Sequence, residues 1–237
     1  MLIAGFPAGS FQANCYILAT QAGADCIVVD PGEGAVAGLR QLFAEHRLTP
    51  VAAFATHGHL DHTAGIGELC LEYDIPAYIH PGDEYMLDDP RAALSPELNA
   101  ALDGLAMDGV RPPTVLPLSD GLQPGLAGLP LTVDHVPGHT PGSVVYRLDR
   151  DGDRPEIVLT GDTLFAGSIG RTDLIGGNLA QELTSIRDRI LSRPDDTVVL
   201  AGHGPTTTVG EQKRSNPFLT EDALARALAG RTETRYG

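Results

Sequence analysis

Residues 56–62, with the sequence Thr-His-Gly-His-Leu-Asp-His, constrain this chain more than any other segment. They follow an apolar run at 51–55. An apolar run that stops at a Gly-containing, His-rich turn predicts a buried strand that ends in a loop. The metal-ligand side chains of the segment are His57, His59, Asp61 and His62. Their density favours a metal site over histidines that lie in a solvated loop by chance.

The spacing within this segment allows for two cations. Residues two apart in an extended chain point the same way, so His57 and His59 can hold one cation together. Asp61 and His62 come one turn later, where residues 63–74 are predicted to form a helix. We expect this second pair to face another cation beside the first.

Three isolated ligand-type residues recur downstream, each at a Gly- or Pro-marked point in the chain. They are His139, Asp162 and His203, and they follow the apolar runs 131–136, 157–160 and 198–201. Catalytic groups commonly lie on loops that a rigid scaffold positions. We therefore expect successive strand ends to deliver ligands to one centre.

The rest of the pattern predicts strands and helices in two similar halves. Strands are predicted at 1–6, 15–19, 26–29, 51–55, 76–79, 129–136, 143–148, 156–160 and 197–201, and helices at 34–47, 63–74 and 179–191. Residues 83–113 are the least periodic and are predicted to form a cap of short helices that walls the substrate pocket. Residues 219–237 are predicted to form a short C-terminal helix. Without a linker or charge run, 1–237 is predicted to be one domain, with mixed α and β in layers.

These motifs resemble those of the metallo-β-lactamase-fold hydrolases, and within them the glyoxalase II-like (hydroxyacylglutathione hydrolase-like) branch. The resemblance rests on the ligand segments above and on Asn14-Cys15-Tyr16, Asp30-Pro31-Gly32, Gly161-Asp162-Thr163-Leu164-Phe165, Gly202-His203-Gly204-Pro205 and Asn216-Pro217-Phe218. It covers nearly the whole chain. The resemblance implies an α+β fold in which two sheets pack face to face between helices, a four-layer αββα sandwich.

The resemblance also implies how the ligands divide. His57, His59 and His139 would hold one ion, Asp61, His62 and His203 the second, and Asp162 would bridge both. Seven ligands exceed what one tetrahedral ion can use. Imidazole with carboxylate suits zinc, our first expectation, but also iron or manganese.

The expected reaction is hydrolysis of a thioester such as S-lactoylglutathione or a related hydroxyacyl-thiol. Two ions that share a water lower its pKa, so that a metal-bridging hydroxide is available at neutral pH to attack the carbonyl. Asp61 is expected to help orient this nucleophile, as the catalytic carboxylate. Asp30, at a strand end, is predicted either to be a plain turn residue or to orient a metal-bound histidine from behind.

Substrate-binding candidates follow from the same resemblance. Lys213 and Arg214 match the basic residues that bind glutathione in this branch, with a surface helix as the alternative. Arg171 is expected either to bind a substrate carboxylate or to pair with Asp173, and we favour the pairing. Only 19 residues follow Phe218, too few for a large C-terminal helical domain, so the thiol carrier stays open.

Other activities use the same set of ligands. Residues 170–173, Gly-Arg-Thr-Asp, are similar to a segment of the persulfide dioxygenases, which bind a single iron on this fold. A lactonase or phosphodiesterase would use the same hydroxide, and a non-catalytic binding module is a further alternative.

Composition narrows the partners. The formal net charge of −15 opposes binding to nucleic acid or to an anionic membrane. Cys15, Cys26 and Cys70 lack a Cys-x-x-Cys spacing and are predicted to be buried reduced thiols. With no basic leader and no long apolar stretch, a cytoplasmic protein that acts on a small molecule is expected. The oligomeric state is undetermined by sequence.

Overall fold

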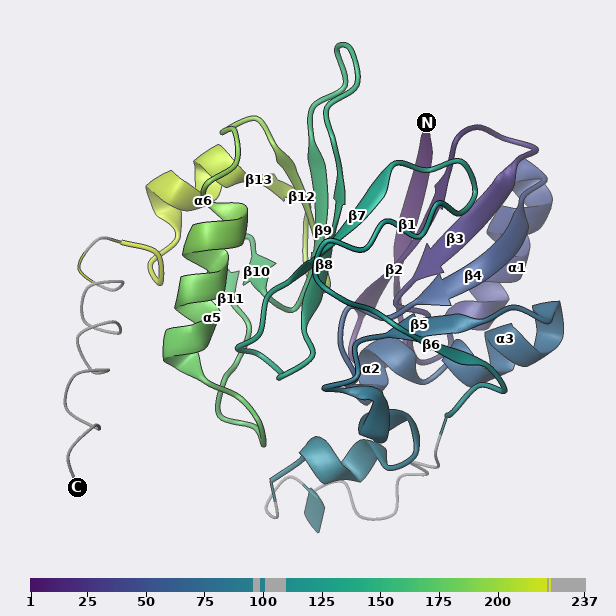
Figure 1. Cartoon of the computed structure of the whole chain (residues 1–237), viewed down its shortest axis with the longest axis horizontal. Helices are drawn as coiled ribbons and strands as arrows, with labels where there is room; N and C mark the ends of the chain where they lie inside the picture. The colour runs from purple at the N-terminus through teal and green to yellow at the C-terminus, as the bar shows by residue number, and fades with distance from the viewer. Residues whose placement is uncertain (96–98, 101–109, 221, 223–237) are drawn as a thin grey trace.

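Two β-sheets pack face to face between two helical layers in the computed structural model of this chain (Figure 1). The structure describes residues 1–95, 99–100, 110–220 and 222. Both sheets direct the ends of several strands, and the loops that follow them, toward the same region of the molecule. That region contains the ligand-type residues.

The first sheet has six strands in sequence order. They are β1 (Leu2–Ala8), β2 (Ala13–Ala19), β3 (Asp25–Val29), β4 (Thr49–Phe54), β5 (Ala77–Ile79) and β6 (Val115–Pro117). The pairs β1–β2 and β2–β3 are antiparallel, and the remaining pairs from β3 to β6 are parallel. The helices α1 (Ala35–His46) and α3 (Ile66–Tyr73) cover its outer face (Figure 1).

The second sheet has five strands in the order β13-β12-β9-β8-β7. They are β7 (Leu131–His135), β8 (Val144–Leu148), β9 (Ile157–Gly161), β12 (Val198–Ala201) and β13 (Thr207–Thr208). The outer face is covered by α5 (Leu179–Ser185), its π-helical continuation η3 (Ile186–Ile190) and α6 (Val209–Ser215) (Figure 1). A separate short hairpin joins β10 (Leu164–Phe165) to β11 (Ser168–Ile169).

Alternation along the strands explains the layers. In β3, Cys26 and Val28 pack toward the helices, whereas Ile27 and Val29 pack toward the second sheet. Because both faces are buried, the strand is apolar from Cys26 to Val29, which is typical of sheets with covered faces. Phe54 meets Tyr146 of the second sheet edge to face, with ring centroids 5.6 Å apart. The predicted four-layer αββα fold is confirmed.

Several elements differ from the sequence expectation. The strands β6, β10, β11 and β13 were not predicted, because two- or three-residue strands carry too little periodicity to be recognised. In place of the predicted helix at 63–74, the structure has a single turn, α2 (Leu60–Thr63), followed by α3. Between them the backbone N–H of Gly65 donates to the carbonyl of Pro31 at 2.8 Å. The predicted helix at 179–191 changes to π geometry after Ser185.

The predicted cap and C-terminal helix lie partly or largely outside the described residues. Within 83–113 the structure describes the 3₁₀ turns η1 (Glu84–Leu87) and η2 (Pro90–Ala93), in agreement with short helices, but not residues 96–98 or 101–109. Of 219–237 it describes only 219–220 and 222. The single-domain assignment stays a prediction. Among the described helices, none has the length and apolar character needed to cross a bilayer.

Candidate metal centre

All seven predicted ligands converge at one end of the two sheets. His57 follows β4, and His59 immediately precedes α2, which carries Asp61 and His62. His139 lies in the loop between β7 and β8, Asp162 directly follows β9, and His203 follows β12. Their potential ligand atoms form three groups, each within 4.8 Å. The first group is His57, His59 and His139, and the second group is Asp61, His62 and His203. A further set, His57, His62 and Asp162, overlaps both.

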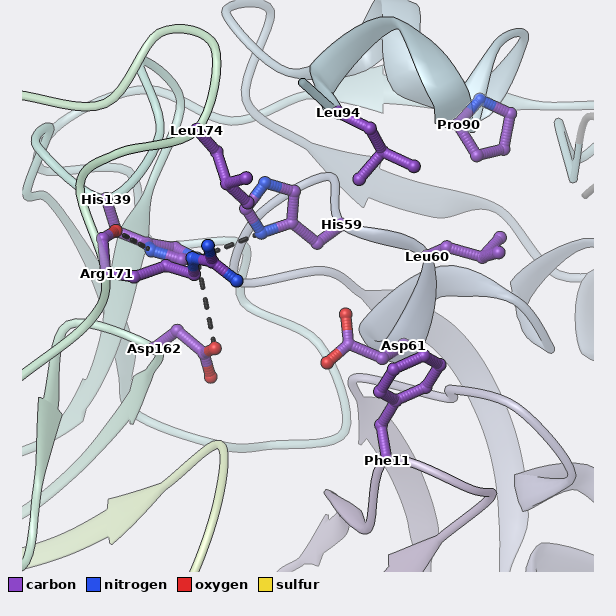
Figure 2. A pocket seen from close by; sticks show the side chains of 10 residues that line it. All are labelled: Phe11, His59, Leu60, Asp61, Pro90, Leu94, His139, Asp162, Arg171 and Leu174. Atoms are coloured by element: carbon purple, nitrogen blue, oxygen red, sulfur yellow. Dashed lines mark hydrogen bonds and ion pairs between the residues drawn. The ribbon is translucent and has the colours of Figure 1, made fainter. Parts of the chain in front are cut away.

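The first group, His57, His59 and His139, consists of three imidazoles whose rings contact one another edge to face. The Nε2 atom of His139 lies 2.9 Å from Nδ1 of His59 (Figure 2). The Nε2 atom of His57 is buried and has no hydrogen-bond partner among the described residues. A buried polar atom without a partner is costly, so this nitrogen indicates a bound group.

The second group, Asp61, His62 and His203, shows similar spacing. Nε2 of His62 lies 3.3 Å from Nε2 of His203 and 3.5 Å from Oδ2 of Asp61. His203 and Asp61 are 3.2 Å apart. Asp162 lies between the groups, with its oxygens 3.2 Å from His62 and 3.8 Å from His139.

Hydrogen bonds behind the rings determine which nitrogens face the centre. Asp30 Oδ2 accepts from Nδ1 of His62 at 3.0 Å, and the carbonyl of Arg171 accepts from Nδ1 of His139 at 2.7 Å. Thr56 Oγ1 donates to Asp30 and therefore accepts from Nδ1 of His57 at 3.0 Å. In their neutral form His57, His62 and His139 thus each direct an unprotonated Nε2 toward the centre.

These facing lone pairs fit a divalent cation. Ligands about 2.0–2.1 Å from a tetrahedral ion lie about 3.3 Å from one another. The observed separations of 2.9–3.8 Å surround that value. The first and second groups share no residue, but His57, His62 and Asp162 form a cluster that links them, so that together they accommodate two ions side by side, with the donor chemistry of zinc, iron or manganese.

The electrostatics of the two groups differ. Burial, followed by the neighbouring imidazoles, keeps the pKa of His57 well below its usual value and lowers the pKa of His59 to about 3. Burial opposes protonation of His62 too, but the carboxylates of Asp162, Asp61 and Asp30 raise its pKa. His57 and His59 are therefore held as neutral imidazoles, the form that binds metal, whereas His62 lies in a negative field that attracts cations.

Two glycines permit this close approach. Gly161, which precedes Asp162, has a φ of 47°, and a Cβ there would lie 2.3 Å from Oγ1 of Thr56. A Cβ on Gly202, which precedes His203, would lie 2.3 Å from Asp162. Neither position accepts a side chain without displacing a ligand loop.

Three buried carboxylates support the ligands from behind. Asp30, the predicted one, also accepts from the backbone N–H of Thr56 at 2.7 Å. Sequence reasoning missed Asp83, which contacts both ligand loops of the first group, and Glu182, which accepts from the backbone N–H of His139 at 2.7 Å. Asp83 lies in a Pro-Gly-Asp turn and Glu182 within a helix, and in both places a solvated carboxylate is the ordinary expectation.

A cavity of about 220 Å³ opens onto the centre (Figure 2). His59, Asp61, His139 and Asp162 form its base. Its other lining side chains are apolar except for Arg171: Phe11, Leu60, Pro90, Leu94 and Leu174. Pro90 and Leu94 belong to the predicted cap segment. The arrangement suits a small substrate with an apolar part beside the reacting group.

The predicted substrate-binding residues lie in two different parts of the structure. Arg171 lines the cavity and forms a bidentate ion pair with Asp173, with both hydrogen bonds at 2.8 Å. This is the pairing that the sequence analysis favours. Lys213 pairs with Asp195 at 2.7 Å. Lys213 and Arg214 lie on α6 and are not among the residues that line the cavity, so their role in substrate binding stays a prediction.

Comparison with known proteins agrees with this geometry. Residues 8–203 match the metallo-beta-lactamase superfamily. An uncharacterized protein of Mycobacterium tuberculosis is 46% identical, with 92% of this chain and 98% of its own covered. The probable metallo-hydrolase YqgX of Bacillus subtilis is 40% identical (92% and 97% covered), and the hydroxyacylglutathione hydrolase GloC of Haemophilus influenzae is 33% identical (90% and 95%).

Two solved structures are also similar. The BLEG-1 B3 metallo-beta-lactamase has a TM-score of 0.80 at 34% identity, with 92% of this chain and 100% of that chain covered. TTHA1623 in a di-iron-bound form has a TM-score of 0.76 at 36% identity, with 91% and 100% covered. From its fold, its ligand groups and these matches, the chain belongs to the metallo-beta-lactamase superfamily, as a metallo-hydrolase.

Proposed function

We propose that this metallo-hydrolase cleaves a thioester, such as S-lactoylglutathione or a related hydroxyacyl-thiol. One observation carries the proposal: ligand atoms from both groups form the base of a small cavity whose walls are mostly apolar. A dinuclear centre activates water, and apolar walls suit the thioester and its hydrocarbon neighbours better than a phosphodiester. The 33% identity to the GloC hydrolase supports the same substrate class.

The residues have distinct roles in this proposal. His57, His59 and His139 would hold one ion, and Asp61, His62 and His203 the other, with Asp162 between them. When bound, two such ions lower the pKa of a shared water toward 7 and so supply hydroxide at neutral pH. Asp61, at the cavity base, accepts a hydrogen bond from the attacking water and orients it toward the carbonyl carbon.

The remaining lining residues position the substrate. Phe11, Leu60 and Leu174 exclude bulk water from the reacting group, which strengthens the local electrostatic interactions. Arg171 lies at the cavity wall and would face an anionic part of the substrate if its pair with Asp173 opened. The cap segment supplies Pro90 and Leu94 and would act as a wall or lid.

For the cofactor we propose two divalent ions, zinc first and iron or manganese as alternatives. The di-iron form of TTHA1623 makes iron a specific alternative. The expected partner is a small-molecule thioester, not nucleic acid or membrane, in a cytoplasmic protein.

A substrate panel tests the proposal. The purified protein, loaded in turn with zinc, iron or manganese, is assayed with S-lactoylglutathione, other acyl thioesters, lactones, a β-lactam and bis(p-nitrophenyl) phosphate. Thioesters should give the highest kcat/KM. Turnover of only the phosphodiester or only the β-lactam would overturn the thioester assignment.

A redox activity has a separate signature. An oxygen electrode with glutathione persulfide, together with metal analysis, tests for a single-iron dioxygenase. We expect two metal ions per chain and no persulfide-dependent oxygen uptake. One iron per chain with such uptake would replace hydrolysis as the function.

A further inference from the structure

We propose that Asp83 is a positioning residue that holds the loop of His57 and His59 against the loop of His139, and thereby sets the metal affinity of this first ligand group. The inference concerns metal binding and holds whether or not the substrate is a thioester.

The contacts of Asp83 reach both loops at once. Its Oδ2 accepts from the backbone N–H of Gly58 at 3.0 Å and from Oγ1 of Thr140 at 2.6 Å. Its Oδ1 accepts from the backbone N–H of Gly142 at 2.7 Å. Gly58 separates His57 from His59, and Thr140 directly follows His139. Each ligand of the first group is thus adjacent to a residue that Asp83 binds.

The packing around Asp83 leaves no free space. Asp83 is fully buried. A Cβ on Gly58 would lie 2.8 Å from the Asp83 carbonyl oxygen, and a Cβ on Gly142 would lie 2.6 Å from its Cγ. Both loops therefore rest directly on Asp83 and its backbone. A change of its side chain must move at least one loop, and with it a ligand, because protein interiors have few voids that could absorb the change.

The chemistry of the contacts requires a carboxylate. All three partners donate, and both oxygens of Asp83 accept. Asparagine offers one carbonyl oxygen and one NH₂ group, which would face a donor. Asp83→Asn keeps the size of the side chain but replaces one or two of these hydrogen bonds by a donor–donor contact.

Glu182 provides an internal comparison. It holds the His139 loop through the backbone N–H of His139 at 2.7 Å, and among the described residues it makes no hydrogen bond to the His57–His59 loop. A stability control is Asp134, a buried carboxylate of β7 that pairs with Arg147 of β8 and with Arg193, which follows η3. Asp134→Asn disturbs a buried polar network that includes no proposed ligand.

The experiment is a zinc titration of the metal-free protein in competition with a chromophoric chelator, with metal content measured by mass spectrometry and thermal unfolding followed in parallel. His59→Ala identifies the binding step that belongs to the first group, because that step disappears. Wild type, Asp83→Asn and Asp134→Asn are compared at equal protein concentration, and Asp83→Glu tests whether a longer carboxylate restores binding.

In Asp83→Asn the first-group step should weaken about 10- to 100-fold, the range for residues behind metal ligands, while the other step is unchanged. Asp83→Glu should recover part of the loss. Asp134→Asn should lower the melting temperature without changing either step. The proposal is overturned if Asp83→Asn binds zinc like wild type, if both steps weaken equally, or if Asp134→Asn shows the same selective loss. Thioester turnover is not used as a readout, so failure of the proposed substrate would leave this result intact.

Discussion

The two ligand groups of the centre are built differently. In the first, His57 and His139 are 1% and 2% exposed, and buried carboxylates hold their loops. In the second, the side chains of Asp61 and His203 are 22% and 29% exposed and face each other directly. Two histidines of the first group are therefore almost fully buried, whereas two ligands of the second group are partly open to solvent.

The second group depends on a contact between the two halves of the chain. Asn14 of β2 donates from its backbone N–H to Gly202 at 2.7 Å and from Nδ2 to the carbonyls of Ala201 and Gly204, both at 3.0 Å. These bonds hold the loop that carries His203. The comparison teaches that both groups join loops of the two sheets, the first through the buried carboxylate of Asp83 and the second through Asn14, which bonds the loop of His203.

The largest expected effect comes from removing a ligand. His59→Ala should lose the first ion and hydrolytic activity together while the chain stays folded, with a loss beyond the roughly 100-fold typical of residues behind ligands. Metal content, activity and far-UV circular dichroism measure this. Full turnover by His59→Ala would show that His59 is not a metal ligand, and the assignment of the first group would then be wrong.

Asp30→Asn should weaken the second group more than the first, because Asp30 bonds His62 directly but reaches His57 only through Thr56. Asp30 is 2% exposed and accepts from Nδ1 of His62, so its loss frees the ring and the affinity for the second ion should fall about 10- to 100-fold. The same zinc titration measures it. If only the first-group step falls and the second is unchanged, the assignment of His62 to the second group is wrong.

A pH series on the metal-free protein tests the buried character of the first group. The pKa of His59 is lowered to about 3 by burial and then by His139, whereas an unfolded histidine titrates near 6.5. As pH falls below about 6.5, the unfolded chain binds the proton first, so stability is lost, by up to about 1.4 kcal/mol per pH unit for this group. Urea unfolding at several pH values should show a shallower decline for His59→Ala. Equal slopes would contradict the burial argument.

The smallest expected effect is at α6. Lys213 pairs with Asp195 at the surface, and exposed ion pairs contribute little. Lys213→Ala should leave both metal steps and the kinetics with a glutathione thioester unchanged. A raised KM with kcat retained would instead restore Lys213 as a substrate-binding residue, and would place carrier recognition on the side of the second sheet.

Much of the fold and the ligand set could be predicted from local pattern. Burial and ligand chemistry require particular residue types at particular spacings. The sequence therefore predicts the apolar runs of β3 and β4 and the His-rich turn after β4. The short strands β6 and β13 could not be predicted, since two or three residues show no recognisable period and, among the described strands, each pairs with only one neighbour at the edge of its sheet. The π-helical stretch after α5 likewise leaves the apolar spacing of the segment unchanged.

By itself, the sequence determined that seven ligand-type side chains end or follow strands in a chain with mixed α and β in layers, and the family resemblance implied the αββα order of those layers. Only the tertiary structure decided which carboxylates support them. Asp83 contacts residues 25, 57 and 59 positions away, and Glu182 one 43 positions away. No local pattern distinguishes such carboxylates from those on the surface, because their hydrogen bonds form only when packing brings distant loops together.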